Sequence, residues 1–450
     1  MNILGEKKKK IRLSMARRFS SFRIIVFGFA LLILVGALLL MTPLASRSGQ
    51  WTDFLSALFT STSAVCVTGL VVLDTGTYWS VFGQVILLIL IQIGGLGIVT
   101  ISLAISIAAG KKIGLMQRSV MSDSVSSPQV GGIVKLTKFI LRGVFGIEGL
   151  GAVIMAPTFI KDFGIVKGIW FAVFHSVSAF CNAGFDLMGN FSSLTRYAGN
   201  PVINITIMSL IVTGGLGFLT WADIVKNKWH FKKYRLQTKM ILTVSFFLIT
   251  VPALVFYFHD FTSETGMTRV LVSLFQSVTT RTAGFNTADV SKMSESGLFL
   301  MAVLMLIGGA PGSTAGGMKV TTFAVVIGNM IAIMRRKNAT EFGNRRVADE
   351  TIRSASTIFA MYLSLLTAGV LIITISDNLP LVPVLYEVAS AVGTVGITMG
   401  ITTGLSTVAR CVIIFLMYLG RVGGLTLIFA ARAKLEVYQA KMPEERVMVG

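Results

Sequence analysis

A short uncharged pattern occurs four times in this chain and restricts its fold more than any other feature. Each copy begins with an aromatic residue followed by a polar one, continues through a serine or threonine and a small residue, and reaches a glycine nine or ten residues after the aromatic. The copies occupy 59–69, 174–184, 275–284 and 386–396. Because they lie roughly a hundred residues apart, each must belong to a complete supersecondary unit rather than to a short solenoid repeat.

The segments around these copies are too apolar for a soluble globular protein. Hydrophobic residues make up 54% of the chain and charged residues 13%, and apolar runs recur that match the roughly 20 residues a membrane-spanning helix needs. The net charge of +20 does not indicate nucleic acid, because the basic residues gather on one side of the predicted spans, around 7–18, 111–118, 226–239 and 335–353. This asymmetry is typical of short cytoplasmic loops and predicts that both termini are cytoplasmic.

Each copy lies in an apolar segment that is too short to cross a membrane and is polar on one side, which is typical of a re-entrant half-helix. These segments are 51–65, 168–180, 269–280 and 381–392. Spans are predicted before them over 22–44, 136–159, 239–258 and 354–375, and after them over 78–102, 201–221, 297–334 and 406–430. A second glycine marks each later span, at Gly94, Gly214, Gly308 and Gly423.

The sequence therefore predicts an all-α membrane protein in which four pseudo-symmetric repeats surround one central pore. Each repeat consists of a span, a pore helix, a glycine strand and a second span, so that eight transmembrane helices accompany four half-helices. The predicted organisation is a basic cytoplasmic N-terminus over 1–21, pore repeats over 22–110, 133–226, 238–337 and 353–431, and a cytoplasmic C-terminal tail over 432–450.

The glycine strands are the candidate ion-binding site. Non-helical backbone at membrane depth is tolerated where protein buries it or where it lines a watery cavity. Glycine permits positive φ, and rings of carbonyl oxygens can replace the hydration shell of potassium. The simpler alternative is that each glycine only allows close helix packing. The candidate filter residues are Val67, Thr68, Gly69, Leu70, Asn182, Ala183, Gly184, Phe185, Thr282, Ala283, Gly284, Phe285, Thr394, Val395, Gly396 and Ile397.

The last span of the third repeat is interrupted at 308–319, where a proline and several glycines cannot hold a continuous helix. A nucleotide-binding loop does not fit, because Met318 stands where such a loop needs lysine. The interruption is either a gate beneath the strands or a passive kink. Arg421 joins the gate candidates as an ionisable residue inside a predicted span. These candidates are Gly308, Gly309, Gly312, Ser313, Thr314, Gly316, Gly317, Lys319 and Arg421.

The chain resembles the Trk/Ktr/HKT superfamily of potassium transporters over nearly its whole length, and within it the membrane subunits KtrB and KtrD of the bacterial Ktr system. The resemblance rests on the four half-helix and glycine units, on the motif TRTAGFNT at 280–287 and on the broken helix at 308–319. It implies potassium uptake across the cell membrane, with the strands as selectivity filter. It also implies that 308–319 is an intramembrane gate, which Arg421 holds at rest.

The same resemblance implies a homodimer docked on a cytosolic ring of RCK-type nucleotide-binding subunits like KtrA or KtrC. Sodium dependence, as in sodium symport, is an open part of this expectation. Gly69 matches the potassium-selective members, since sodium-preferring plant relatives have serine at this position. The basic loops are also expected to contact anionic membrane lipids.

Two further hypotheses remain for the sequence. The first is that the chain is a secondary transporter, which carries an organic solute at a midplane site between broken helices. The second concerns Glu387, which shares the half-helix position of Thr60, His175 and Gln276. This equivalence favours a structural hydrogen bond that braces the half-helix over coordination of an ion by Glu387. The sequence contains no cofactor fingerprint, metal-ligand spacing or nucleophile–base pair, so neither an enzyme nor an organic cofactor is expected.

Overall fold

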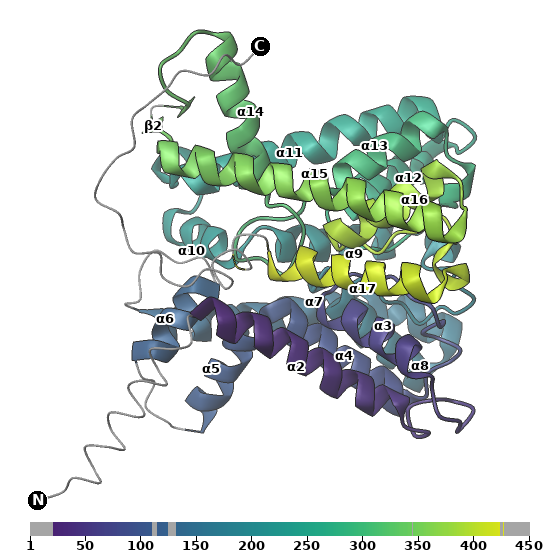
Figure 1. Cartoon of the computed structure of the whole chain (residues 1–450). Coiled ribbons are helices and arrows are strands. Elements are labelled where there is room, and N and C mark those ends of the chain that lie inside the picture. The colour runs from purple at the N-terminus through teal and green to yellow at the C-terminus, as the bar shows by residue number, and fades with distance from the viewer. Residues whose placement is uncertain (1–20, 110–114, 125–131, 344, 424–425, 427–450) are drawn as a thin grey trace, which may run out of the picture.

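The computed structural model describes residues 21–109, 115–124, 132–343, 345–423 and 426. Most of the predicted N-terminal segment and the whole predicted C-terminal tail lie outside these residues. The described part is mostly helical (Figure 1). Four helices are long and apolar enough to cross a membrane, and six spans result if two bent pairs each count as one. The four are α2 (Ser21–Met41), α7 (Ile133–Phe163), α11 (Leu236–Val255) and α15 (Asp349–Asp377).

Each of these long helices is followed by a shorter apolar helix that packs against it. The four shorter helices are α3 (Phe54–Val65), α8 (Ile165–Phe180), α12 (Gly266–Thr279) and α16 (Leu381–Gly393). The first and last residues of these helices agree with the predicted bounds of the half-helices to within three residues. Asp53 begins the first of them, because its carboxylate accepts a hydrogen bond from the backbone N–H of Ser56 at 3.1 Å and caps the helix.

The helices that follow the glycine strands differ from the prediction, which had continuous spans over 78–102 and 201–221. Helix α4 (Val81–Leu96) meets α5 (Ile98–Ala108) at 97°, and α9 (Pro201–Gly215) meets α10 (Phe218–Asn227) at 96°. The bends occur at Gly97 and Gly217, whose φ values of +83° and +86° are incompatible with a continuing right-handed helix. The prediction of straight spans here was therefore wrong.

The second glycine mark of the fourth segment was also misplaced. Gly94 and Gly214 pack against the last carbonyls of α3 and α8, and Gly420, rather than Gly423, packs in the same way against Val392 near the end of α16. Gly423 instead has the φ of +84° that is found at the two bends. Consequently Arg421, the next-to-last residue of α17 (Thr407–Val422), is the counterpart of Gly95.

The third segment contains α13 (Glu295–Met305) and α14 (Val320–Met334), and the loop 306–319 separates them as predicted. Helix α6 (Leu115–Ser124) was not predicted, since its polar sequence resembles a connecting loop. Helix α11 continues directly into the π-helical segment η3 (Phe256–Asp260). The remaining elements are the single 3₁₀ turns η1 (Thr195–Tyr197), η2 (Phe231–Lys233), η4 (Val290–Lys292) and η5 (Thr402–Gly404), and a small antiparallel hairpin of β1 (Glu341–Phe342) and β2 (Arg345–Arg346).

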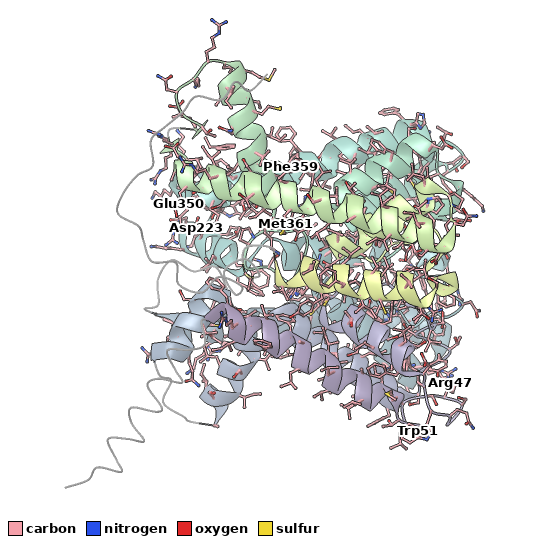
Figure 2. All side chains as sticks on the ribbon, in the orientation of Figure 1. Arg47, Trp51, Asp223, Glu350, Phe359 and Met361 are labelled. Atoms are coloured by element: carbon pink, nitrogen blue, oxygen red, sulfur yellow. The ribbon has the colours of Figure 1, made fainter. Side chains whose placement is uncertain are left out.

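The core lies around the short helices, and apolar side chains also cover the outside. The aromatic residues that begin the four copies of the pattern are at most 1% exposed, and they are Phe59, Phe174, Phe275 and Tyr386. Along α2, by contrast, Phe27, Leu31 and Leu38 are about 60% exposed, as expected for a lipid-facing helix. Arg47 and Trp51 lie at one end of the long helices, and Asp223 and Glu350 lie at the other (Figure 2).

Candidate ion-binding site

The four glycine strands share an unusual backbone conformation. The strand glycines have positive φ, and so do the residues two positions before them: Val67, Asn182, Thr282 and Thr394, with φ of +51°, +56°, +63° and +52°. Left-handed φ costs a non-glycine residue about 1–2 kcal/mol, and three of these residues are β-branched. Such strain, repeated at matching positions, persists where the surrounding structure enforces it and is associated with function.

The four strands meet at their glycines. A side chain on any one glycine would collide with the carbonyl oxygen just before the glycine of the next strand. A Cβ on Gly69 would lie 2.6 Å from the oxygen of Ala183, one on Gly184 2.9 Å from that of Ala283, one on Gly284 2.6 Å from that of Val395, and one on Gly396 would overlap the oxygen of Thr68. The contacts run from the first strand to the fourth and return to the first. The glycines therefore form a closed ring, in which each glycine lies beside a carbonyl oxygen of the next strand.

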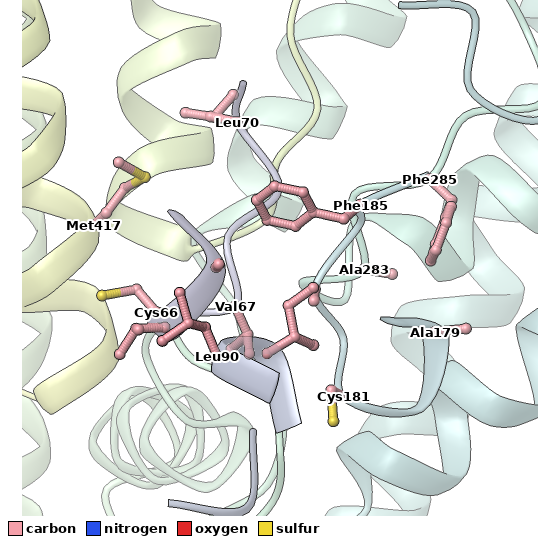
Figure 3. Close-up of a cluster of buried hydrophobic side chains, with 14 of the residues drawn as sticks. Cys66, Val67, Leu70, Leu90, Ala179, Cys181, Phe185, Ala283, Phe285 and Met417 are labelled. Atoms are coloured by element: carbon pink, nitrogen blue, oxygen red, sulfur yellow. The ribbon is translucent and has the colours of Figure 1, made fainter. Parts of the chain in front are cut away.

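The side chains of the residues that follow the glycines are buried in the interior. Leu70, Phe185, Phe285 and Ile397 are at most 1% exposed, and the first three lie in a buried apolar cluster with Val67 and Ala283 (Figure 3). These four predicted site residues therefore contribute side chains to the packing that holds the strands.

Hydroxyl groups on the short helices attach to the strands. Ser63 and Ser390 accept hydrogen bonds from the N–H groups of Gly69 and Gly396, at 3.0 and 2.9 Å. The equivalent hydroxyls in the other two segments donate instead to the carbonyl after the glycine, from Ser178 to Phe185 at 2.7 Å and from Thr279 to Phe285 at 2.6 Å. This explains why every copy of the sequence pattern has serine or threonine at this position.

The polar residue at the second position of the pattern braces the chain beyond the strand in three of the four segments. His175 accepts from the N–H of Leu187 at 3.3 Å, and Gln276 donates to the side chain of Asn286 at 3.1 Å. The carboxylate of Glu387 accepts from Thr398 at 2.6 Å and from Thr402 at 2.5 Å. Thr60 instead bonds within its own helix, to Ser56. The expected bracing role of Glu387 is confirmed.

On one side of the glycine ring lies an open cavity of about 730 Å³. The four strand glycines line it, and the acidic residues in the described part of its lining are Asp186, Asp260, Glu264 and Asp289. The Asp260 side chain is buried, and Asp289 pairs at 3.4 Å with Lys292, the one basic residue among these described lining residues. Asp186 lies two residues beyond Gly184. Burial and the charge of Asp74 raise the pKa of Asp186 to about 7, although a hydrogen bond from the N–H of Met188 opposes the rise.

On the other side of the ring lies the loop 306–319, which is held against the ends of α9 and α17. The N–H of Ala310 donates to Gly215 at 2.9 Å, and that of Gly317 donates to Gly420 at 3.2 Å. The hydroxyl of Thr314 lies 3.0 Å from the carbonyl of Phe180 and 2.9 Å from Oδ1 of Asn182. The loop is thus hydrogen-bonded directly to the second strand.

Arg421 fastens this loop to the first segment. Its guanidinium donates to the carbonyls of Thr314, Gly94 and Gly95, the last at 3.0 Å. Arg421 also lines a smaller cavity of about 250 Å³ together with Lys319, Ser313 and Gly317. Among the described residues that line this cavity there are two basic side chains and no carboxylate. The two sides of the ring therefore differ in the sign of their charge.

The structure brings most of the predicted residues together, and it adds others. Gly308, Gly309, Gly312 and Gly316 belong to the loop, and the ammonium group of Lys319 donates to the carbonyl of Ala315 at 2.7 Å. Gln92 was missed: its amide donates to the carboxylate of Glu148 at 3.0 and 3.2 Å. Sequence reasoning also missed Asp186, although its fixed distance from Gly184 was a usable signal. No group of three potential metal ligands occurs in the described part of the chain.

Comparison with known proteins gives a consistent picture over most of the chain. The model of a family described as "TrkH: Cation transport protein" matches residues 6–441. The chain is 40% identical to the potassium/sodium uptake protein NtpJ of Enterococcus hirae, over 98% of this chain and 99% of that one. It is 37% identical to the Ktr system potassium uptake protein B of Bacillus subtilis, over 96% and 97% of the two chains.

A solved structure has the same fold. The potassium transporter TrkH from Vibrio parahaemolyticus superimposes with a TM-score of 0.71, covering 92% of this chain and 85% of that one at 20% identity.

Proposed function

The chain belongs to the TrkH family of cation transport proteins, and on this premise we propose that it takes up potassium across the cell membrane through a central pore. Four repeats surround this pore, and the carbonyl oxygens of the glycine strands form its selectivity filter. Cations move down their electrochemical gradient, to which an inside-negative potential contributes about 2.3 kcal/mol per charge per 100 mV.

The closed ring of the four glycines is the observation that carries the proposal. Carbonyls that converge on one axis can replace the water around a dehydrated cation. The short helices end directly before the strands, so the partial negative charge of their C-terminal ends favours a cation there. The acidic outer cavity further supports cation entry from that side, because a cleft lined by one sign of charge concentrates ions of the opposite sign.

The loop 308–319 is the gate of this pore, and Arg421 holds it in place at rest. Two observations support this role: the loop is hydrogen-bonded to the second strand, and it carries the cationic side chain of Lys319 and is bound by that of Arg421. Positive charge on the inner side opposes the passage of cations until the loop and Arg421 move. A passive kink would need neither the bond from Thr314 to the strand nor a buried guanidinium.

The protein works as a homodimer on a cytosolic ring of RCK-type nucleotide-binding subunits, with both termini in the cytoplasm. The Ktr system names of its relatives support such partners. The basic stretches 226–239 and 335–346 are the proposed docking sites, and Trp229 within the first of them is 98% exposed. Sodium is included as an accompanying ion because the name of the Enterococcus hirae relative contains both ions.

Uptake of rubidium or potassium into proteoliposomes that hold the purified chain tests the proposal. Uptake that excess potassium suppresses and excess sodium does not is the expected result. Equal suppression by both ions would contradict a selective filter. Shortening the loop 308–319 should raise uptake without the cytosolic partner, and lower uptake by a folded variant would contradict the gate. Absence of any cation flux from both proteins would contradict the pore itself and favour the transport of an organic solute.

A further inference from the structure

Buried side-chain oxygens without partners lie at the end of the filter next to the gate loop. Thr282 and Thr394 occupy the strained positions two residues before their glycines and are fully buried. The hydroxyl of each has no hydrogen-bond partner within the described residues. A buried hydroxyl without a partner costs about 1–3 kcal/mol. A polar group that is retained in this state at a strained position therefore indicates a missing ligand.

The equivalent residue of the second strand, Asn182, also has a side-chain oxygen and the same left-handed φ. The amide nitrogen of Asn182 donates to the carbonyl of Arg281 at 3.2 Å, which leaves Oδ1 to accept. The fourth equivalent residue, Val67, has no side-chain oxygen. The inner end of the filter thus carries oxygens from three of its four strands, namely from Asn182, Thr282 and Thr394, and we call these three residues the inner ring.

The gate loop contacts the inner ring at two places. The hydroxyl of Thr314 donates to Oδ1 of Asn182 at 2.9 Å. Gly316 packs so closely against Thr394 that any side chain on Gly316 would overlap its hydroxyl. The same stretch of loop also holds the ammonium group of Lys319, which donates to Ala315 and Gly316 at 2.7 and 3.4 Å. The docked loop therefore places a hydrogen-bond donor against the inner ring and carries a positive charge within the same stretch.

We propose that the inner ring binds a dehydrated potassium ion through side-chain oxygens, and that the Thr314 hydroxyl takes the place of this ion when the gate loop is docked. The inference rests on the proposed function and adds to it a link between ion occupancy and gating. A donated hydrogen and a cation compete for the same lone pairs of Asn182. The ammonium group of Lys319 opposes the ion in addition, by charge repulsion.

Competition of this kind has a thermodynamic consequence. If docking of the loop weakens ion binding, ion binding must weaken docking by the same factor, because the coupling is reciprocal. A rising potassium concentration then shifts the gate loop from the docked to the undocked state. Potassium also satisfies the two threonine hydroxyls that have no partner while the loop is docked.

Hydrogen exchange of the loop tests this coupling directly. Amide exchange of residues 308–319 would be followed by mass spectrometry on the full chain in detergent, in potassium and in N-methyl-D-glucamine at equal ionic strength. We expect exchange to be about tenfold faster in potassium, which corresponds to a coupling of about 1.4 kcal/mol. The double variant T282V/T394V, in which methyl groups replace the hydroxyls, should lose this acceleration.

Two further variants complete the test. T374V removes another buried hydroxyl without a partner, in α15 and away from the strands, and should keep the acceleration. T314V should raise uptake at low potassium in proteoliposomes, whereas T314S should behave as the wild type. Two results would overturn the inference without affecting the proposed uptake of potassium by the wild type. One is an exchange rate of 308–319 that is the same in potassium and in N-methyl-D-glucamine, and the other is an equal acceleration by potassium in T282V/T394V. Failure of wild-type uptake would contradict the proposed function instead.

Discussion

Replacing Gly69 by alanine should weaken discrimination between potassium and sodium while the protein remains folded. A Cβ at this position would lie 2.6 Å from the oxygen of Ala183, whereas ordinary contact begins at 3.4 Å. The second strand must therefore move by about 0.8 Å, and it carries the carbonyl that is proposed to hold the ion. A displacement of that size removes one oxygen from its coordination distance.

The backbone makes a separate contribution, for which the chain offers a matched control. Gly69 has φ of +92° and Gly400 has φ of +90°, but a Cβ on Gly400 would meet no atom within 4 Å. In both G69A and G400A, the left-handed φ should therefore cost the same free energy of about 1–2 kcal/mol. Only G69A should also disturb the ring. We expect its preference for potassium to fall by at least about tenfold, or about 1.4 kcal/mol, and that of G400A to stay as in the wild type.

The assay is rubidium uptake into proteoliposomes with potassium or sodium as competitor, after gel filtration and thermal unfolding have shown that both variants are folded. The ratio of the two competitor concentrations that halve the uptake measures the preference. An unchanged ratio in folded G69A would refute the carbonyl ring as the source of selectivity. An equal loss in both variants would attribute the effect to backbone strain rather than to the contact between strands.

Three other substitutions test separate parts of the site. R421Q removes the charge that ties the loop to α4 and should raise resting uptake, measured without the cytosolic partner; unchanged uptake would mean that Arg421 does not restrain the gate. Because the pKa of Asp186 is raised to about 7 by burial and by Asp74, its carboxylate loses charge as the outside pH falls through that value. Uptake at low potassium should therefore decline between about pH 8 and about pH 6, and a D186N variant that keeps this decline would exclude Asp186 as its cause. E387Q leaves one threonine hydroxyl without an acceptor and should cost about 1–3 kcal/mol of stability, seen as a lower unfolding midpoint; an equal midpoint would show that Glu387 does not brace the strand.

The repeated pattern and the hydropathy of the chain were sufficient to predict the four long helices, the four short helices and the interruption between α13 and α14, but not α6 or the two bends. The short helices were located to within three residues, because a helix too short to span the bilayer and ending at a glycine strand has a recognisable sequence. The bracing by Glu387 could also be predicted, since its partners lie only 11 and 15 residues away. Hydrophobic periodicity and short-range hydrogen bonds are properties of neighbouring residues, so a linear sequence discloses them.

The contacts that close the ring of glycines were decided by the tertiary structure. The bends at Gly97 and Gly217 depend on which neighbour each helix meets, and the true counterpart of Gly94 in the fourth segment became clear from its packing against Val392. Arg421 reaches Gly95 across 326 residues of sequence and Thr314 across 107. No local pattern encodes such a pairing, because the free energy that selects it comes from satisfying a buried guanidinium with carbonyls that only the assembled fold brings within reach.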